Sequence, residues 1–407
     1  MEKLSKQLTL KYAMLQGTYW ISECVIYGFA VVYLQYKNFD NTQIGIIIAL
    51  SAIMSIILQP VIAGYVDKSK KVNLRFLVII LMFIVFVSAF ILFFIHNSFY
   101  LIAGIYVLIN TIQFTLNSLF NSLAFEYMNK GIPINYGLAR GGGSIAYAVT
   151  SSVLGVSVSR FGPGILLTVF LFSYILLIAA AYAFKISNKK SLSSAIDLAK
   201  NPYEEENQTV NAPTSILGFF MKYKKYTLLL IGIAMIFYSH SLLNTFLFNI
   251  IQNAGGDSAD MGLALTISAA LELPTMAGFI FLVRRIKCGT LLKISAFFFV
   301  IKVIIAWLAP NVAVIYISQA LQMLSFALYT PASVYYVNSI IDKEDRVKGQ
   351  SMLGVASWGI AGSIASITGG KILDTLGVSD MLLFGTLIAA IGFVIVFFTT
   401  DNRNIKA

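Results

Sequence analysis

The chain has 407 residues, of which 58% are hydrophobic and only 12% are charged, and its formal net charge is +11. Soluble domains carry about 25% charged residues, so this composition excludes an ordinary soluble enzyme and indicates a membrane protein. The positive charge could suggest a nucleic-acid partner, but its distribution along the chain favours a membrane instead.

Apolar blocks of about 20 residues recur along the chain, each long enough to cross a hydrocarbon core of about 30 Å. They predict twelve transmembrane helices, near 11–35, 42–65, 74–95, 99–128, 137–160, 164–184, 226–251, 260–283, 289–308, 311–340, 349–373 and 381–399. We therefore expect an all-α integral membrane protein.

The basic residues lie mainly on one side of these spans. Of the 29, Lys37, Arg160 and Lys371 fall on the opposite side and Lys302 falls inside a span. The other 25 lie on the side that carries both termini. By the positive-inside rule we expect both termini in the cytoplasm of a cell whose plasma membrane holds the protein.

One long polar segment divides the spans into two sets of six. It predicts an N-terminal bundle over 1–185, a cytoplasmic linker over 186–225 and a C-terminal bundle over 226–407. Two such halves are typical of a transporter built from repeats, with its substrate site between the halves near the middle of the membrane.

Several polar residues recur at helical spacing inside the spans. Gln16, Trp20, Glu23 and Tyr27 share one face of the first span. The fourth span has such a line in Asn110, Gln113, Asn117 and Asn121, the tenth in Gln319, Gln322, Phe326 and Tyr329, and the seventh contributes His240 and Asn244. Amides are costly against lipid, so either a water-filled cavity or close helix packing must receive these faces.

Glu272 in span 8 and Lys302 in span 9 are the most natural buried pair, because two opposite charges can stay ionised together. Such a pair is either a structural salt bridge or a carboxylate that alternates between a proton and the cation. His240 is a further group that could titrate near neutral pH, or else a hydrogen-bonding residue. Amides and aromatic rings around a cavity suit a polyhydroxylated or nucleoside-like solute.

The stretch Tyr136–Tyr147 reads YGLARGGGSIAY and opens the fifth span. It lacks the strand that precedes a phosphate-binding loop, and its three glycines permit close approach of helices. With the span pattern, this stretch resembles the major facilitator superfamily, in the branch of lactose permease and related oligosaccharide or nucleoside proton symporters. That branch has Tyr/Phe-Gly-x-x-Arg followed by Gly-Ser-x-(Gly/Ala) at this place. Gln59–Leu77 is similar to the superfamily's loop signature, which implies a gating role for Asp67.

The resemblance implies that Arg140 binds solute hydroxyls and that Tyr147, about two turns later on the same face, stacks on the solute ring. It also implies a partner for Arg140 late in span 4, for which Glu126 and Asn121 compete; we prefer Glu126 as the charge partner and Asn121 as a cavity residue. The candidate solute-binding residues are Arg140, Tyr147, Glu126, Asn117, Asn121, Asn244, Gln322, Lys302 and Trp358.

Around Gln322 the chain lacks the histidine and glutamate that serve proton coupling in lactose permease, and Trp358 replaces a lysine of that permease. Coupling would then use Glu23, Glu272 or His240. Glu23 is the first choice, because an acid in span 1 serves this role in other sugar symporters.

We therefore expect a proton-coupled transporter that takes up a sugar, oligosaccharide or nucleoside by alternating access. The alternatives are efflux of sugars or drugs, an uncoupled facilitator of the same fold and a non-transporting membrane sensor. We expect no enzyme activity, metal or cofactor beyond the proton gradient. The expected partners are a small polar solute, protons and the lipid bilayer, without nucleic acid, and we expect the chain to act as a monomer.

Overall fold

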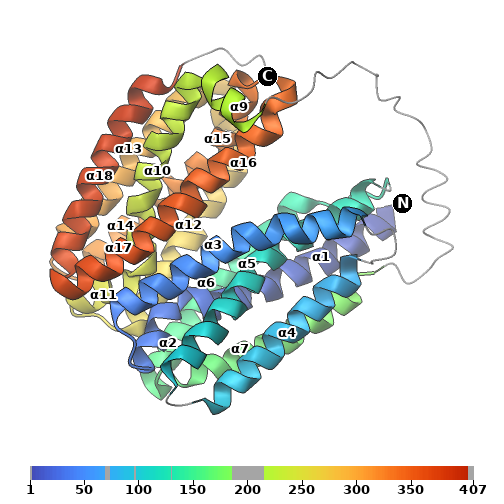
Figure 1. The fold of residues 1–407 in the computed structure, drawn as a ribbon, viewed down its shortest axis with the longest axis vertical. Helices are drawn as coiled ribbons and strands as arrows, with labels where there is room; N and C mark the ends of the chain where they lie inside the picture. Colours follow the sequence, from blue (N-terminus) through green and yellow to red (C-terminus); the bar gives the residue numbers. More distant parts are fainter. Residues whose placement is uncertain (1, 69–73, 96–97, 130, 186–214, 402–407) are drawn as a thin grey trace. The chain divides into compact units, whose positions relative to one another are not determined.

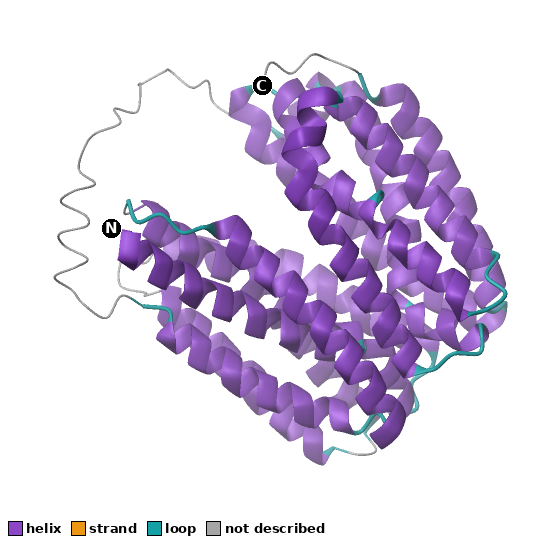
Figure 2. Cartoon of the chain, turned by 180° about the vertical axis from the view of Figure 1, so that it is seen from behind, coloured by secondary structure: helices purple, strands orange, loops and turns teal. Residues whose placement is uncertain are grey.

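The computed structural model describes residues 2–68, 74–95, 98–129, 131–185 and 215–401. In these ranges the chain consists of helices and loops without a β-strand (Figure 2). Among the described residues, eleven helices are long and apolar enough to cross a membrane, or up to twelve if the pair Leu4–Gly28 and Ala30–Tyr36, bent by 46°, is one span. The predicted all-α membrane fold is confirmed.

The chain divides into two compact units. Unit 1 comprises 1–37 and 51–208, and unit 2 comprises 38–50 and 209–407. The predicted boundaries at 185 and 225 stay predictions, because most of the predicted linker, 186–214, lies outside the described residues.

Unit 1 is a bundle whose first helix lies against two others. Its elements are α1 (Glu2–Glu23), the π-helix η1 (Cys24–Gly28), α2 (Ala30–Tyr36), the later part of α3 (Asn41–Lys68), α4 (Leu74–Phe94), α5 (Phe99–Asn129), α6 (Tyr136–Phe161) and α7 (Ile165–Ala183). Helix α1 packs against α6 and α7, and α4 packs against α5 and α7.

Unit 2 is organised around α10, which contains an apolar stretch of 18 residues, 72% of it buried. Its elements are α9 (Ile216–Lys222), α10 (Lys224–Thr245), α11 (Leu247–Asn253), α12 (Ser258–Arg285), α13 (Cys288–Trp307), α14 (Val312–Ala320), the 3₁₀ turn η2 (Leu321–Met323), α15 (Phe326–Ile340), the 3₁₀ turn η3 (Lys343–Asp345), α16 (Arg346–Gly354), the π-helix η4 (Val355–Ala361), α17 (Gly362–Thr375) and α18 (Val378–Thr399). Helix α10 packs against α18 and α17, and α13 packs against α18 and α15 (Figure 1).

Helix α4 shows how such a span is built. Its sequence, LRFLVIILMFIVFVSAFILFF, is apolar on every side, so hydropathy alone does not tell which face is buried. The buried residues Val78, Met82, Val85, Ala89 and Leu92 follow one another at steps of three and four. They form one face against the bundle, while Phe76, Phe83 and Phe90 on the rest of the surface are exposed, as expected for a lipid-facing side.

The first residues of α3 are grouped with unit 2 through a close contact with α17. The carboxylate of Asp374 accepts hydrogen bonds from the backbone N–H of Thr42 at 2.7 Å and from that of Asn41 at 3.2 Å, and the side chains of both residues also donate to it. These are the free N–H groups of a helix start, which a carboxylate satisfies well. Glycines make the approach feasible, because a Cβ on Gly370 would lie 2.1 Å from the carbonyl oxygen of Asn41 and one on Gly45 would lie 2.0 Å from that of Ser366.

Candidate functional site

The Arg140 side chain of unit 1 lies on the face of α6 that meets α1. Helix α6 begins after Asn135, whose side chain accepts from the backbone N–H of Leu138. Arg140 follows in the second turn, with its Cζ 4.2 Å from the centre of the Trp20 ring and its Nη1 donating to Ser144 at 3.2 Å. The structure therefore adds a cation–π contact to the residue that the sequence singled out.

A chain of hydrogen bonds leads from this ring to Asn121 on α5. Trp20 Nε1 donates to Gln16 Oε1 at 3.2 Å, and Gln16 Nε2 donates to the Tyr12 hydroxyl at 2.7 Å. The hydroxyls of Tyr12 and Tyr136 both donate to Asn121 Oδ1, at 2.9 and 3.0 Å. Tyr12 was not predicted from the sequence, and Tyr136 was named only as the first residue of the motif that contains Arg140. Tyr12 could have been found from its place one turn before Gln16 on the same helix face.

Tyr147, the predicted stacking residue, also lies beside Trp20. The two ring centres are 6.1 Å apart with the planes at 72°, an edge-to-face arrangement. Arg140, Trp20 and Tyr147 thus form one aromatic and cationic group in unit 1.

Glu23 is buried at the end of α1, with 6% of its surface exposed. The Tyr19 hydroxyl lies 3.4 Å from its Oε2, and no lysine or arginine of the described residues forms an ion pair with it. The π-helix η1 begins at the next residue.

Gln113 on α5 takes part in helix packing. Its Nε2 donates to Ser22 Oγ at 2.8 Å, and its Oε1 accepts from the Tyr174 hydroxyl at 2.9 Å. Two of the polar residues predicted on one face of span 4 therefore have different surroundings. Gln113 joins neighbouring helices, and Asn121 accepts the hydrogen bonds of Tyr12 and Tyr136.

In unit 2, the predicted pair Glu272 and Lys302 is linked through an amide. Lys302 Nζ donates to Gln322 Oε1 at 2.5 Å, and Gln322 Nε2 donates to Glu272 Oε1 at 2.8 Å. Lys302 is 1% and Gln322 5% exposed, so this cation is buried and hydrogen-bonded, as a buried charge requires. The structure therefore joins the coupling candidate Glu272 to two of the candidate solute-binding residues, Gln322 and Lys302.

One turn before Gln322, the amide of Gln319 is 1% exposed and has no hydrogen-bond partner among the described residues. A buried unsatisfied amide is costly and indicates a place where a water molecule or solute group can bind. The 3₁₀ turn η2 separates α14 from α15 at this point.

His240 lies in an aromatic cluster of unit 2. Its ring is stacked on Phe326, with centres 5.5 Å apart and an interplanar angle of 11°, and Asn244 Nδ2 donates to a ring nitrogen at 2.9 Å. Trp358 meets His240 edge-on at 6.1 Å and is 49% exposed. His240 and Asn244, which the sequence named as polar residues of one span, therefore contact each other, and Trp358 lies beside them.

Irregular helical turns accompany these polar groups, and sequence reasoning did not find them. The π-helix η1 follows Glu23, the 3₁₀ turn η2 contains Gln322 and the π-helix η4 contains Trp358. Such interruptions are frequent at functional sites, because they redirect side chains and leave backbone groups available.

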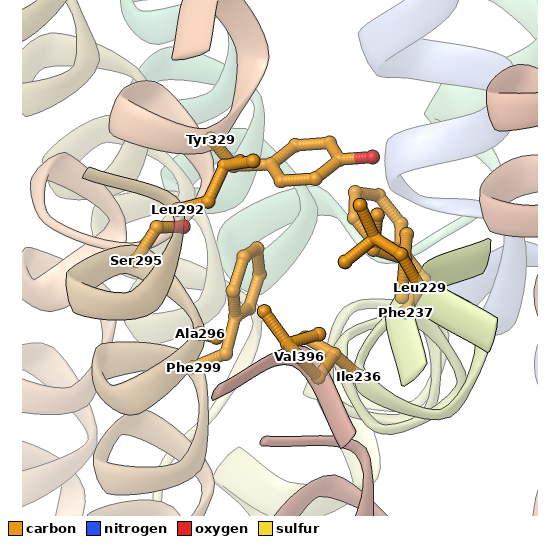
Figure 3. Close-up of a pocket in the computed structure, with 10 residues that line it drawn as sticks. Leu229, Ile236, Phe237, Leu292, Ser295, Ala296, Phe299, Tyr329 and Val396 are labelled. Atoms are coloured by element: carbon orange, nitrogen blue, oxygen red, sulfur yellow. The ribbon is translucent and has the colours of Figure 1, made fainter. Parts of the chain in front are cut away.

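An apolar cavity of about 10 Å³ lies inside unit 2, lined by rings of Phe237, Phe299 and Tyr329 together with aliphatic side chains (Figure 3). This volume is at the lower limit for a single water molecule. The cavity is a packing gap and cannot hold a solute.

At one end of unit 2, α9 is tied to the loop that follows α15. Lys222 Nζ lies 2.9 Å from Asp342 Oδ2 and 3.3 Å from Asp345 Oδ2. The hydrogen bond from Lys222, with one from the Tyr223 hydroxyl, holds the pKa of Asp342 below its usual value.

The remaining predicted residues occupy less informative positions. Asn117 is half-buried on α5, and Glu126 is exposed near the end of that helix. Asp67 lies in the last turn of α3, and its side chain is outside the described residues. The pairing of Glu126 with Arg140 and the gating role of Asp67 stay predictions.

A model of the MFS_1 like family matches residues 13–384, and so almost the whole span pattern. The chain belongs to this family. It is therefore a multi-pass membrane transporter of the major facilitator superfamily and not an enzyme, as the resemblance implied.

Curated relatives of this transporter are distant. Maltose permease of Geobacillus stearothermophilus is 21% identical over 374 residues, which cover 89% of this chain and 87% of the permease. The uncharacterized transporter YwbF of Bacillus subtilis (strain 168) is 23% identical over 398 residues, or 96% of this chain and 94% of its own.

Solved structures show the same fold. The nucleoside transporter NupG has a TM-score of 0.74 at 15% identity, with 97% of this chain and 98% of NupG covered. The D-xylose-proton symporter has a TM-score of 0.68 at 14% identity, with 98% of each chain covered. At these identities the likeness concerns the fold alone.

Proposed function

We propose that the protein is a proton-coupled secondary transporter that takes up a sugar, oligosaccharide or nucleoside across the plasma membrane. In this proposal both termini are cytoplasmic and a single chain is the working unit. Maltose is the solute in the name of one distant relative, and nucleosides are the solutes in that of a structure with the same fold.

The observation that carries the proposal is the hydrogen-bonded group around Arg140 in unit 1. Hydrogen bonds join the Trp20 indole, two amides and two tyrosine hydroxyls, and the guanidinium of Arg140 and the ring of Tyr147 lie against Trp20. Amides and hydroxyls both donate and accept hydrogen bonds, as the hydroxyls of a sugar or ribose require. Aromatic faces and edges match the apolar surface of a sugar ring or base.

In unit 2, Gln319 adds a buried amide without a partner among the described residues, and Trp358 adds a half-exposed ring. Gln322, Asn244 and Lys302 complete the polar side chains that we propose for solute binding in this unit. We assign Asn117 and Glu126 to the same role in unit 1, and gating to Asp67.

Glu23 is our first candidate for the proton-coupling acid. A buried carboxylate without a cation is costly when ionised, and protonation removes that cost. Glu272 and His240 are the further candidates. Glu272 accepts a hydrogen bond from Gln322, which in turn accepts one from Lys302, and His240 has a titratable imidazole ring.

The test is accumulation by purified protein in liposomes that carry an inward pH gradient. Radiolabelled maltose and uridine serve as probes of the two solute classes. We expect accumulation of one of them above equilibrium. Glu23→Gln should abolish this accumulation and spare solute exchange, because exchange needs no net proton movement. Glu344→Gln, which alters an acid in the turn η3, is the matched control and should behave as the wild type.

If the solute only reached equal concentrations on both sides of the liposome membrane despite the pH gradient, this would contradict proton coupling and indicate a facilitator. Failure to transport or bind any sugar or nucleoside would contradict the solute class.

A further inference from the structure

The indole of Trp20 lies directly on the backbone of α6, at Gly143. A Cβ on Gly143 would lie 2.4 Å from Trp20 Cδ1, 3.0 Å from Nε1 and 3.2 Å from Cγ. Real Cβ atoms do not approach this closely, so any larger residue at 143 would displace the ring. The two neighbouring glycines differ, because a Cβ on Gly141 or Gly142 would have no atom within 4 Å.

Two side chains of α1 also contact this ring. Gln16 Oε1 accepts from the indole N–H, and the Tyr19 ring meets it edge-on with centres 5.5 Å apart. Backbone contact, hydrogen bond and ring contact together define one position for Trp20.

Arg140 lies one turn before Gly143 on the same helix, and its guanidinium covers the Trp20 ring at 4.2 Å. A guanidinium that stacks on an aromatic face keeps its N–H donors in the plane parallel to the ring. One of these, on Nη1, donates to Ser144. The orientation of the guanidinium plane therefore depends on where the indole lies.

We infer that Gly143 and Trp20 are positioning residues for Arg140: the glycine seats the indole, and the indole sets the plane in which the guanidinium donates to solute oxygen atoms. This inference rests on the proposed function of Arg140 in solute binding. In this inference Trp20 contacts Arg140 and not the solute. Tyr147 is then the aromatic ring that a sugar ring or base would contact.

The first experiment measures solute affinity in the Gly143→Ala variant, with Gly141→Ala and Gly142→Ala as matched controls. The probe is whichever of maltose and uridine the wild type transports. We expect the KM of Gly143→Ala to rise about 10-fold, the scale of a lost cation–π contact, with the maximal rate much less affected. Both control variants should keep the wild-type KM, because the added methyl group meets open space.

A double-mutant cycle with Trp20→Ala separates positioning from general damage to the helix. If Gly143 acts through the indole, Gly143→Ala should have no further effect on KM once Trp20 is alanine. Additive losses would overturn the inference.

A readout without solute uses the fluorescence of Trp20, taken as the difference between each protein and its Trp20→Phe counterpart. Arg140 covers a face of the ring, so Arg140→Ala and Gly143→Ala should both make Trp20 more accessible to acrylamide quenching, and Gly142→Ala should not.

The outcomes distinguish the inference from the function on which it rests. If Arg140→Ala transports solute with the wild-type KM, the assignment of Arg140 to solute binding fails. If Arg140→Ala loses affinity but Gly143→Ala keeps both the wild-type KM and the wild-type quenching, only the positioning role fails.

Discussion

The two units hold their charged side chains in different ways. In unit 1, Glu23 has no ion-pair partner among the described residues, and Arg140 lies against an aromatic ring. In unit 2, Lys302 and Glu272 are connected through the amide of Gln322. A buried charge needs either compensation or a means to neutralise. Glu23 in unit 1 therefore depends on a proton to remove its charge, which agrees with the coupling role that we propose for it, whereas the buried Lys302 in unit 2 is compensated through Gln322.

The largest expected effect concerns this chain of charges in unit 2. Lys302→Met removes the buried cation and its hydrogen bond to Gln322, so we expect the free energy of unfolding to fall by about 3 kcal/mol. Adding Glu272→Gln should restore much of the loss, since no unbalanced charge then remains. Thermal unfolding of the detergent-solubilised protein measures both effects.

Glu23→Gln is the comparison within unit 1. It removes a charge that has no ion-pair partner in the described part of the chain, so we expect no comparable loss of stability. If it destabilised the protein as much as Lys302→Met, the contrast between the units would be wrong.

The next effect concerns the acceptor at the centre of the hydrogen-bond chain in unit 1. Asn121→Leu leaves the hydroxyls of Tyr12 and Tyr136 without their shared acceptor, and one unsatisfied buried donor costs about 1–3 kcal/mol. We expect a lower unfolding temperature together with a higher KM for solute. The KM should respond because the same chain leads through Gln16 to Trp20.

Asn117→Leu is the matched control on the same helix, one turn earlier. Asn117 is half-buried and makes no hydrogen bond within the described residues. A loss of stability as large as that of Asn121→Leu would show that the hydrogen bonds of Asn121 are not its cause.

A smaller effect is expected where the start of α3 meets α17. Asp374→Ala removes the acceptor for the first N–H groups of α3, a loss on the scale of a helix cap, about 1 kcal/mol. Hydrogen exchange of the amides of Asn41 and Thr42 should become faster, while Lys371→Ala one turn earlier should leave them unchanged. Unchanged exchange in Asp374→Ala would mean that this carboxylate does not hold the helix start.

The smallest effect is the pH dependence of the exposed pair Lys222 and Asp342. Because Lys222 holds the pKa of Asp342 below its usual value, the pair adds stability above the ordinary carboxyl pKa of about 3.9. That stability is lost as the pH falls through the lowered pKa of the folded state. Surface pairs contribute little, so only a small difference in unfolding temperature between wild type and Lys222→Met is expected at pH 7, and it should vanish in acid. A difference that persists in acid would assign the stabilisation to packing of the Lys222 stem.

The sequence by itself determined the membrane class, the helical spans and the superfamily. A span of about 20 apolar residues has almost no alternative to a helix in lipid, because every backbone N–H and C=O must be satisfied within the segment. The span pattern and the YGLARGGGSIAY stretch together resemble the major facilitator superfamily, and the family match confirmed this superfamily. The spacing of three and four residues along α1 likewise suffices to place Gln16, Trp20 and Glu23 on one helix face.

Only the tertiary structure decided which of these residues meet. Helical periodicity assigns a residue to a face but does not say which helix lies opposite. Sequence spacing therefore did not show that Gln322 joins Lys302 to Glu272, or that Asn121 receives the hydroxyls of Tyr12 and Tyr136. The difference among Gly141, Gly142 and Gly143 is of the same kind. These three identical neighbours differ in the space around them, because only Gly143 lies against the indole of Trp20, which belongs to another helix.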